Sequence, residues 1–175
     1  MNNAIAVLMG AVLSATTALA FAASTTVTIN QIDDKGAGKS LGTVKADDSK
    51  DGLVLIVALT GLPPGEHGFH VHESPSCDAK ERDGKPVAGL GAGGHYDPAS
   101  TAKHEGPKGK GHLGDLPALV VDKDGKANGK LVASRLKVAD LKGRAIMIHE
   151  GGDNYSDNPK PLGGGGARIA CGVAK

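Results

Sequence analysis

Aromatic side chains are almost absent from this chain. Its 175 residues include two phenylalanines, two tyrosines and no tryptophan. The hydrophobic core must therefore be built from Val, Leu, Ile and Ala. The same scarcity argues against two kinds of function: a structural protein with a large apolar or aromatic patch for its partners, and a platform on which nucleic-acid bases stack.

The chain also lacks an excess of charge of either sign. Lys and Arg total 20 and Asp and Glu total 19, so the formal net charge is +1. Nothing global favours binding to nucleic acid or to an anionic membrane. A short basic run at residues 108–111 (KGKG) has no interleaved aromatic residue. We therefore expect no nucleic-acid partner.

Charged side chains are missing from the first 22 residues. An apolar run from Ala4 to Leu13 is followed by small residues, and residues 18–20 and 20–22 both fit an Ala-x-Ala cleavage site. This pattern predicts a secretory signal peptide at residues 1–22 that is cleaved, although the usual basic residue near the start is missing. The alternative, a retained membrane anchor, is disfavoured because the run is short for a bilayer. No later segment could cross one, and residues 23–175 are predicted to form a single domain.

Cysteine is limited to Cys77 and Cys171, both in the predicted exported part. An even count in an exported chain indicates one disulfide. The alternative, two free buried thiols, would suit a cytosolic protein. A loop of roughly 95 residues closed in this way would contribute about 4–5 kcal/mol on the chain-entropy model.

Glycine and proline are plentiful, with 27 and nine copies, which favours turns over long helices. Short apolar or alternating runs predict strands. The predicted strands are Ser24–Asn30, Leu53–Leu59, Gly68–His72, Ala118–Val121, Leu131–Leu136 and Ala145–His149, with a turn at Asp122–Gly129. Short strands with long loops indicate an all-β fold, an antiparallel sandwich or barrel.

Two long stretches, Ser74–Leu116 and Gly151–Ala167, show no strand or helix period. Loops of this length inside one domain are usually functional or tied down. The first holds Cys77 and several histidines, so a disulfide and metal ligands could hold it in place. The role of residues 31–51 stays open at this point.

Six of the seven histidines and one aspartate are spaced as a two-metal site would require. His70 and His72 are two residues apart on a predicted strand, so both rings face the same side. His149 ends another strand. His104, His112 and Asp115 share one loop, with His95 upstream.

Imidazole suits copper and zinc, and a carboxylate can complete a zinc tetrahedron. Three histidines and an aspartate would make a closed, structural zinc site. The other set would leave a position open, as a redox metal needs. The seventh histidine, His67, is predicted to be a hydrogen-bonding strut instead.

From Gly65 to Val173 the chain resembles the copper–zinc superoxide dismutase family, and in particular its exported bacterial branch. Gly68–His72 (GFHVH) matches one signature of the family, and Gly165–Gly172 (GGARIACG) is similar to the other. Asp153–Asp157 before Pro159–Gly163 resembles the bacterial branch specifically. Ser24–Pro64 matches only loosely.

The resemblance implies a flattened Greek-key β-barrel or sandwich of immunoglobulin-like type, an architecture of which this family is itself a standard example. It implies the following ligands: copper on His70, His72, His95 and His149, and zinc on His95, His104, His112 and Asp115. His95 would then bridge the two metals. Asp153 corresponds to the carboxylate that links a copper histidine to a zinc histidine, with Asp157 as the weaker candidate. The disulfide Cys77–Cys171 matches the family's internal disulfide.

The implied activity is the conversion of superoxide to oxygen and hydrogen peroxide, with copper cycling between Cu(II) and Cu(I) while zinc stays structural. His95 and Arg168 are the implied catalytic residues. His95 would release copper and carry a proton, and Arg168 would pair with the anion through its fork of donors.

Several alternatives stay open. Lys103, Lys108 and Lys110 either steer superoxide electrostatically or are ordinary surface lysines. An exported carrier of copper or zinc on the same scaffold is the alternative function, although it would be expected to lack a copper ligand or Arg168. The resemblance implies a periplasmic location. It allows a monomer or a homodimer, since both occur in the family.

Overall fold

The computed structural model describes residues 23–175, and the predicted signal peptide at residues 1–22 lies outside the described part. The strands are β1 (Ser24–Asp33), β2 (Gly36–Ser49), β3 (Gly52–Thr60), β4 (Gly65–His67), β5 (Phe69–His72), β6 (Lys80–Arg82), β7 (Lys85–Val87), β8 (Leu119–Val121), β9 (Lys126–Ala133), β10 (Arg144–His149) and β11 (Arg168–Ala174). The helical turns are η1 (Leu90–Ala92), α1 (Val138–Leu141) and η2 (Leu162–Gly164). No helix of residues 23–175 has the length and apolar character needed to cross a bilayer.

Alternation of side chains builds the strands around one core. In β1, Val27 and Ile29 are buried while Thr26 and Thr28 face outward. Strand β3 follows the same rule over most of its length, with Ile56 exposed on its outer face. The core is aliphatic, as predicted, and Phe69 is the aromatic side chain buried within the described part of the chain.

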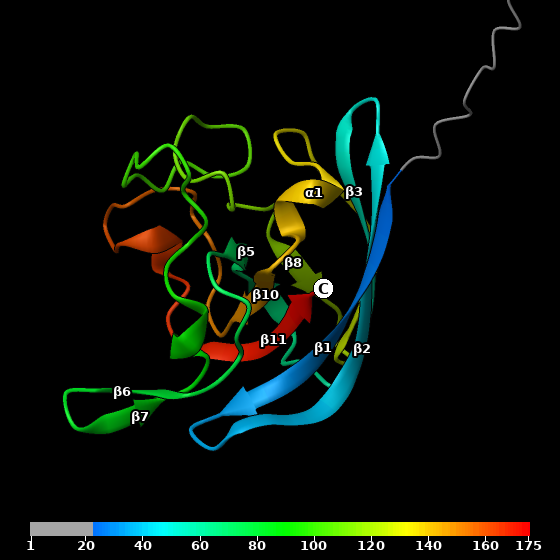
Figure 1. The fold of residues 1–175 in the computed structure, drawn as a ribbon. Helices are drawn as coiled ribbons and strands as arrows, with labels where there is room; N and C mark the ends of the chain where they lie inside the picture. Colours follow the sequence, from blue (N-terminus) through cyan, green and yellow to red (C-terminus); the bar gives the residue numbers. More distant parts are fainter. Residues whose placement is uncertain (1–22) are drawn as a thin grey trace, which may run out of the picture.

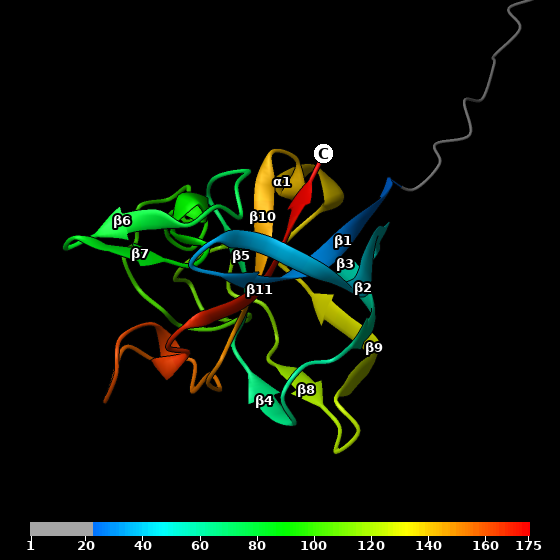
Figure 2. The same ribbon diagram turned by 90° about the horizontal axis from the view of Figure 1, so that it is seen from below.

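Seven antiparallel strands form one sheet in the order β5-β10-β11-β1-β2-β3-β9. Its two edges are linked, because β4 precedes β5 by one residue and pairs with β8, which turns directly into β9. The sheet is thereby curved into a barrel (Figures 1 and 2). This confirms the predicted all-β Greek-key fold, since β3 and β5, consecutive major strands, lie near opposite edges of the sheet.

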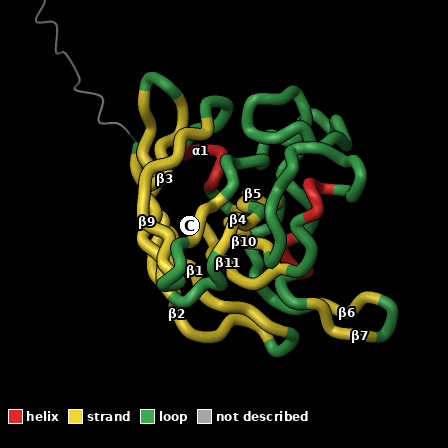
Figure 3. Tube along the Cα trace, turned by 180° about the vertical axis from the view of Figure 1, so that it is seen from behind, coloured by secondary structure: helices red, strands yellow, loops and turns green. Residues whose placement is uncertain are grey.

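The strands gather on one side of the molecule and the long loops on the other (Figure 3). The loop from Ser74 to Leu116 was predicted without strands, which is wrong for its β6–β7 hairpin. That hairpin projects away from the barrel (Figure 2). Residues 80–86 of the hairpin are all exposed and mostly charged, so the hairpin has no hydrophobic period to detect. The loop at Gly151–Ala167 carries only the short turn η2.

Two further strand predictions need correction. The segment Leu131–Leu136 is strand only to Ala133, and the strand begins earlier, at Lys126, within the predicted turn. The partner β3 sets this range, because Thr60 pairs with Lys126 and Leu53 with Ala133. Strand β2 was not predicted at all. Its sequence is polar and glycine-rich, and it is held by pairing on both sides with β1 and β3.

A glycine in β2 shows why that sequence is nonetheless suited to its place. Gly42 has a φ of +131° and lies where the β1–β2 register shifts. A Cβ atom there would overlap the carbonyl oxygen of Ala58 on β3. Only glycine combines this backbone angle with such a close approach.

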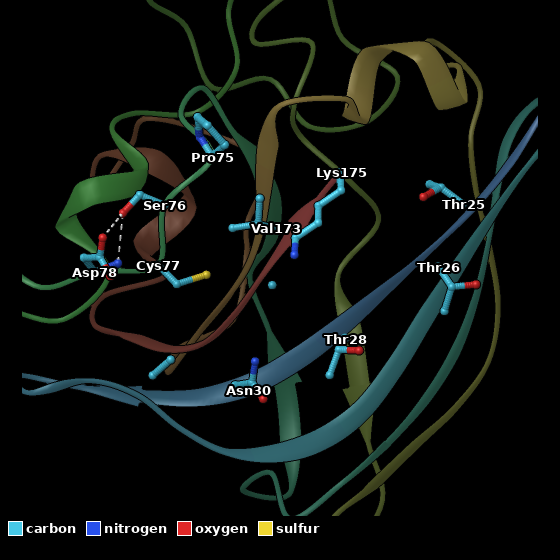
Figure 4. Close-up of a pocket in the computed structure, with 12 residues that line it drawn as sticks. Thr25, Thr26, Thr28, Asn30, Pro75, Ser76, Cys77, Asp78, Val173 and Lys175 are labelled. Carbon is cyan, nitrogen blue, oxygen red and sulfur yellow. Dashed lines mark hydrogen bonds between the residues drawn. The ribbon is translucent and has the colours of Figure 1, made fainter.

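Strands β1 and β11 pair only around Asn30 and Gln31. Beyond this point a groove of about 520 Å³ opens between them (Figure 4). Threonines of β1 line one wall, and Val173, Lys175 and the segment at Cys77 line the other. None of the histidines lines this groove, so it is separate from the candidate metal centre.

Candidate metal centre

The edge strand β5 brings the histidines together. Its His70 and His72 lie opposite Met147 and Ala145 of β10. The end of β10 stays beside the start of β5, because His149 N–H donates to Gly68 O at 2.8 Å. A register shift in the β10–β11 pairing falls between Ile148 and His149. The His72 and His149 Nε2 atoms consequently approach to 3.4 Å.

Two loop segments pair with the edge of β5 that faces away from β10. Tyr96 N–H donates to Val71 O, and Val71 N–H donates to Gly114 O, each at 2.8 Å. The loop residues His95 and Asp115 thereby form isolated bridges to His72 and His70. Backbone hydrogen bonds to an edge strand are what place the loop's ligands beside the strand's ligands.

The first group of side chains comprises His70, His72, His95 and His149, all buried, with one candidate ligand atom each within 4.8 Å of the others. These are the four residues implied for copper. The structure brings all of them together from two strands and a loop.

The second group is centred on Asp115. Its Oδ1 lies 3.0 Å from His95 Nδ1 and its Oδ2 lies 3.0 Å from His104 Nδ1. The set of four that includes Asp115 and has all ligand atoms within 4.8 Å of one another contains His70 in place of the expected His112. His112 is nevertheless buried, and its Nδ1 lies 3.4 Å from Asp115 Oδ1.

Four buried imidazole nitrogens lack a hydrogen-bond partner: His70 Nδ1, His95 Nε2, His104 Nδ1 and His112 Nδ1. The short distance between His104 Nδ1 and Asp115 does not give hydrogen-bond geometry, so it does not satisfy that nitrogen. Buried polar atoms without partners are costly. Nitrogen and carboxylate donors aimed at a common point fit a cation of the copper and zinc class. The donor set therefore fits two metal ions that share His95.

The second nitrogen of each copper-group ring from the strands is fixed by the protein. His70 Nε2 donates to Asp153 Oδ2 at 2.8 Å, and His72 Nδ1 donates to Gly93 O at 3.0 Å. His149 Nδ1 contacts Gly166 O at 3.3 Å. Such partners set the tautomer and the ring orientation. In each case the nitrogen left over is the one directed at the cluster.

Asp153 connects the two groups. Its other oxygen, Oδ1, accepts from His104 Nε2 at 2.7 Å. Gly163, with a φ of +70°, lies against this link, and a Cβ atom there would overlap Asp153 Oδ1. Asp157, the weaker candidate, instead accepts from the backbone N–H of His104 at 2.9 Å. The geometry therefore favours Asp153 as the linking carboxylate.

Burial keeps most of the rings neutral. It is the main cause that lowers the pKa of His95 to about 4 and that of His149 to about 3, and the charge of His70 adds to both effects. His104 is the exception. Burial lowers its pKa, but the adjacent carboxylates of Asp115 and Asp153 outweigh this and raise it to about 9.

Arg168 lies at the start of β11, opposite His149 in the β10–β11 pairing. Its Nη1 donates to Gly89 O at 2.6 Å and its Nη2 to Gly93 O at 2.7 Å. The Gly93 carbonyl also holds His72, so one oxygen positions both the arginine and a copper-group histidine. Burial, and then the charge of Arg82, lower the pKa of Arg168 from its usual value.

Two further sequence predictions are confirmed. Cys77 and Cys171 form a disulfide, which ties the Ser74–Leu116 loop to β11. The ring nitrogens of His67 lie 2.8 Å from the carbonyl oxygens of His149 and Pro63. His67 is thus a strut behind a copper-group histidine. The roles of the carbonyls at Gly89, Gly93 and Gly166 could not be predicted from the sequence, because every residue type has a backbone acceptor.

Comparisons with known proteins agree with this geometry. The family model described as "Copper/zinc superoxide dismutase (SODC)" matches residues 40–174. "Superoxide dismutase [Cu-Zn] 2" of Salmonella typhimurium is 57% identical over 155 residues, which cover 88% of this chain and 90% of the relative. "Superoxide dismutase [Cu-Zn]" of Escherichia coli K12 is 56% identical over the same shares. The structure of "Cu/Zn superoxide dismutase from Brucella abortus" superposes with a TM-score of 0.86 at 54% identity, covering 87% of this chain and 100% of the other.

The chain belongs to the copper–zinc superoxide dismutase family. It is an oxidoreductase whose substrate is superoxide and whose cofactors are copper and zinc.

Proposed function

We propose that this enzyme converts superoxide to oxygen and hydrogen peroxide at two metal ions joined by His95. Copper would be held by His70, His72, His95 and His149, and zinc by His95, His104, His112 and Asp115. The observation that carries the proposal is the double role of His95. His70 and His95 both belong to both groups of donors, but His70 Nε2 donates to Asp153. His95 instead has Nδ1 beside Asp115 and a buried Nε2 that has no partner.

When bound, copper would supply the one-electron oxidation and reduction that superoxide dismutation requires, and zinc would hold its ligands in place. The protein's own part is positioning and proton handling. The pKa of His95 near 4 means that its ring is neutral at physiological pH. Its Nδ1 lies beside Asp115 and its Nε2 has no partner, so Nε2 is the atom that we expect to take up a proton during turnover and return it to the leaving peroxide.

Arg168 supplies the positive charge beside the site. Burial lowers its pKa, but an arginine guanidinium keeps its charge at neutral pH. Two of its donors are used by glycine carbonyls, which fix its plane. The remaining N–H groups could bind a small anion such as superoxide, the class of ligand that a rigid guanidinium fork suits.

A carrier of copper or zinc is the weaker alternative. A carrier has no use for a partly buried arginine fixed beside the copper-group histidines, since an arginine binds anions and repels metal cations. All four expected copper ligands are also present and gathered. Both observations favour turnover over storage.

We further propose that residues 1–22 are removed and that the remaining domain, 23–175, works in the periplasm. The disulfide supports an oxidising compartment. The homodimer stays a prediction, which sedimentation of the mature chain would test. The absence of a nucleic-acid partner also stays a prediction, in line with the net charge of +1.

The first test is superoxide decay by the mature chain loaded with copper and zinc, followed as salt is raised. We expect fast decay that slows with ionic strength, as for a steered anion. The zinc-only protein is the matched control and should show no decay above background. Full occupancy of both metals without decay would contradict the proposal and favour the carrier.

A further inference from the structure

We propose that Arg135 is a positioning residue for zinc, which fixes the backbone of the loop that carries His112. The zinc loop is here residues 103–115. Nη1 of Arg135 donates to Gly109 O, and Nη2 donates to His112 O and, at 3.1 Å, to Gly111 O. One guanidinium thus holds three neighbouring carbonyls, including that of a zinc ligand. The inference rests on the zinc ligands proposed above.

The place of Arg135 in the fold makes it a rigid anchor. It follows Ala133, the last residue of β9, which pairs with Leu53 in the main sheet. The next residue, Leu136, is 1% exposed and its N–H donates to Ala133 O at 3.2 Å. The arginine backbone is therefore held between the sheet and the core, and its side chain reaches out to the loop.

The guanidinium is directed at this loop alone. It is partly buried, and no ion pair formed within residues 23–175 involves Arg135. Removing a guanidinium from water without a carboxylate partner is unfavourable unless its donors are used. Here the loop carbonyls accept from both Nη atoms, while the buried Nε has no partner.

The zinc loop needs an external anchor because it has no regular structure of its own. It is folded tightly on itself, with His112 N–H donating to Lys103 O at 2.8 Å. Gly111 lies so close to this carbonyl that a Cβ atom would overlap it. In this conformation several carbonyls face one side, and a planar guanidinium can bind them together. A lysine, with a single ammonium group, cannot reproduce that fork.

This anchor concerns zinc rather than copper. Among the proposed ligands, only His112 accepts a hydrogen bond from Arg135 at its backbone. The His112 Nδ1 is buried, has no partner and lies 3.4 Å from Asp115 Oδ1. Loss of the anchor would let this ring move away from Asp115. Outer partners of metal ligands typically alter affinity by roughly 10–100-fold.

The test is the rate of zinc release to a chromophoric chelator in Arg135→Met and Arg135→Lys. We expect release at least roughly tenfold faster in Arg135→Met, an intermediate rate in Arg135→Lys, and nearly unchanged copper release. Cobalt(II) placed at the zinc site should show an altered visible spectrum. Lys137→Met is the matched control. Lys137 is two residues away and donates to Ser49 O at 2.8 Å, so its variant should release zinc at the wild-type rate.

Three outcomes would overturn the inference. The first is zinc release at the wild-type rate in both Arg135 variants. If Arg135→Met does not fold, the rate in Arg135→Lys alone decides. Equal changes in copper release, zinc release and the unfolding midpoint of the metal-free chain would indicate a general packing role instead. His112→Gln serves as the reference. If His112→Gln keeps zinc, both the proposed ligand set and this inference are wrong. If His112→Gln loses zinc but the Arg135 variants do not, only this inference is wrong.

Discussion

Asp153 is hydrogen-bonded to one histidine from each group of proposed metal ligands. It is 6% exposed and accepts from His70 Nε2, from His104 Nε2 and from the Tyr155 N–H. No neighbouring residue duplicates this arrangement in the described chain, because Asp157 reaches only the backbone of His104 and of Leu162.

Asp153→Asn should loosen both metals. An amide offers one oxygen in place of two, so one histidine must lose its acceptor. We expect copper and zinc each to be released roughly 10–100-fold faster, measured by transfer to chelators specific for each ion. Asp157→Asn is the control. It should speed the release of zinc only, and by a smaller factor than Asp153→Asn does. Faster release of only one metal from Asp153→Asn would contradict the bridging role.

Arg168→Ala should lower the rate of superoxide decay while copper and zinc contents stay nearly unchanged. The arginine contacts glycine carbonyls rather than a ligand atom. Loss of one charge beside the site should cost roughly tenfold or more in rate, measured at low salt. Arg168→Lys keeps the positive charge but lacks the fork of donors, so its rate should lie between those of the wild type and Arg168→Ala. Metal loss comparable to the loss of rate would count against the role of Arg168.

The gathering of the histidines and of Asp115 could be predicted from the sequence because these side chains have a distinctive chemistry and spacing. His70 and His72 share a strand face, and the loop ligands are histidines or an aspartate. The contacts of Arg135 could not be predicted, since nothing in its neighbourhood distinguishes it from a surface arginine. The place of His112 at the margin of the second group likewise depends on how the loop folds.

Among the elements, the long loops are organised by what they bind rather than by their own hydrogen bonds. The Ser74–Leu116 loop pairs with the edge of β5, is linked to β11 through Cys77, and supplies the carbonyls that hold Arg168. Strand β2 likewise could not be predicted from its own residues. Its glycine-rich, polar sequence becomes a strand only because two partners lie beside it.

Removal of the disulfide should destabilise the chain strongly. The two cysteines are 94 residues apart, so the bond restricts a large loop in the unfolded chain. We expect Cys77→Ser combined with Cys171→Ser to lower the free energy of unfolding by about 4–5 kcal/mol, measured by urea denaturation. A reductant should reproduce the effect in the wild type and leave the variant unchanged. A loss under about 1 kcal/mol would contradict the loop-closure account.

At the scale of the whole molecule, the strands lie on one side and the long loops on the other (Figure 3). The candidate metal centre lies where the loop residues His95 and Asp115 pair with β5. The centre gathers many buried titratable rings in one place. Without metal, those rings must be kept uncharged or paired. The stability of the metal-free protein should therefore report on their titration.

Acid should destabilise the metal-free chain. The pKa values of His95 and His149 fall from 6.5 to about 4 and about 3 on folding. Their contribution is complete above pH 6.5 and is lost as the pH falls toward these values, because the unfolded chain then binds more protons. The pKa of His104, raised to about 9, acts in the opposite sense. Its contribution is present below pH 6.5 and is lost between 6.5 and 9.

We therefore expect the free energy of unfolding of the metal-free protein to be greatest near pH 6.5, measured by urea denaturation across the range. His149→Gln should reduce the slope on the acid side and leave the alkaline side unchanged. A flat profile between pH 6.5 and 4.5 would show that these rings do not titrate with folding.

The carboxylate of Asp153 has a thermodynamic consequence for assembly. Asp153 accepts a hydrogen bond from one ring of each group. The ion that binds first therefore orders Asp153, which is also the acceptor for a ligand of the second ion. Reciprocity requires that any gain in zinc affinity caused by copper equals the gain in copper affinity caused by zinc. The order of loading would then change the path to the finished enzyme but not its final free energy.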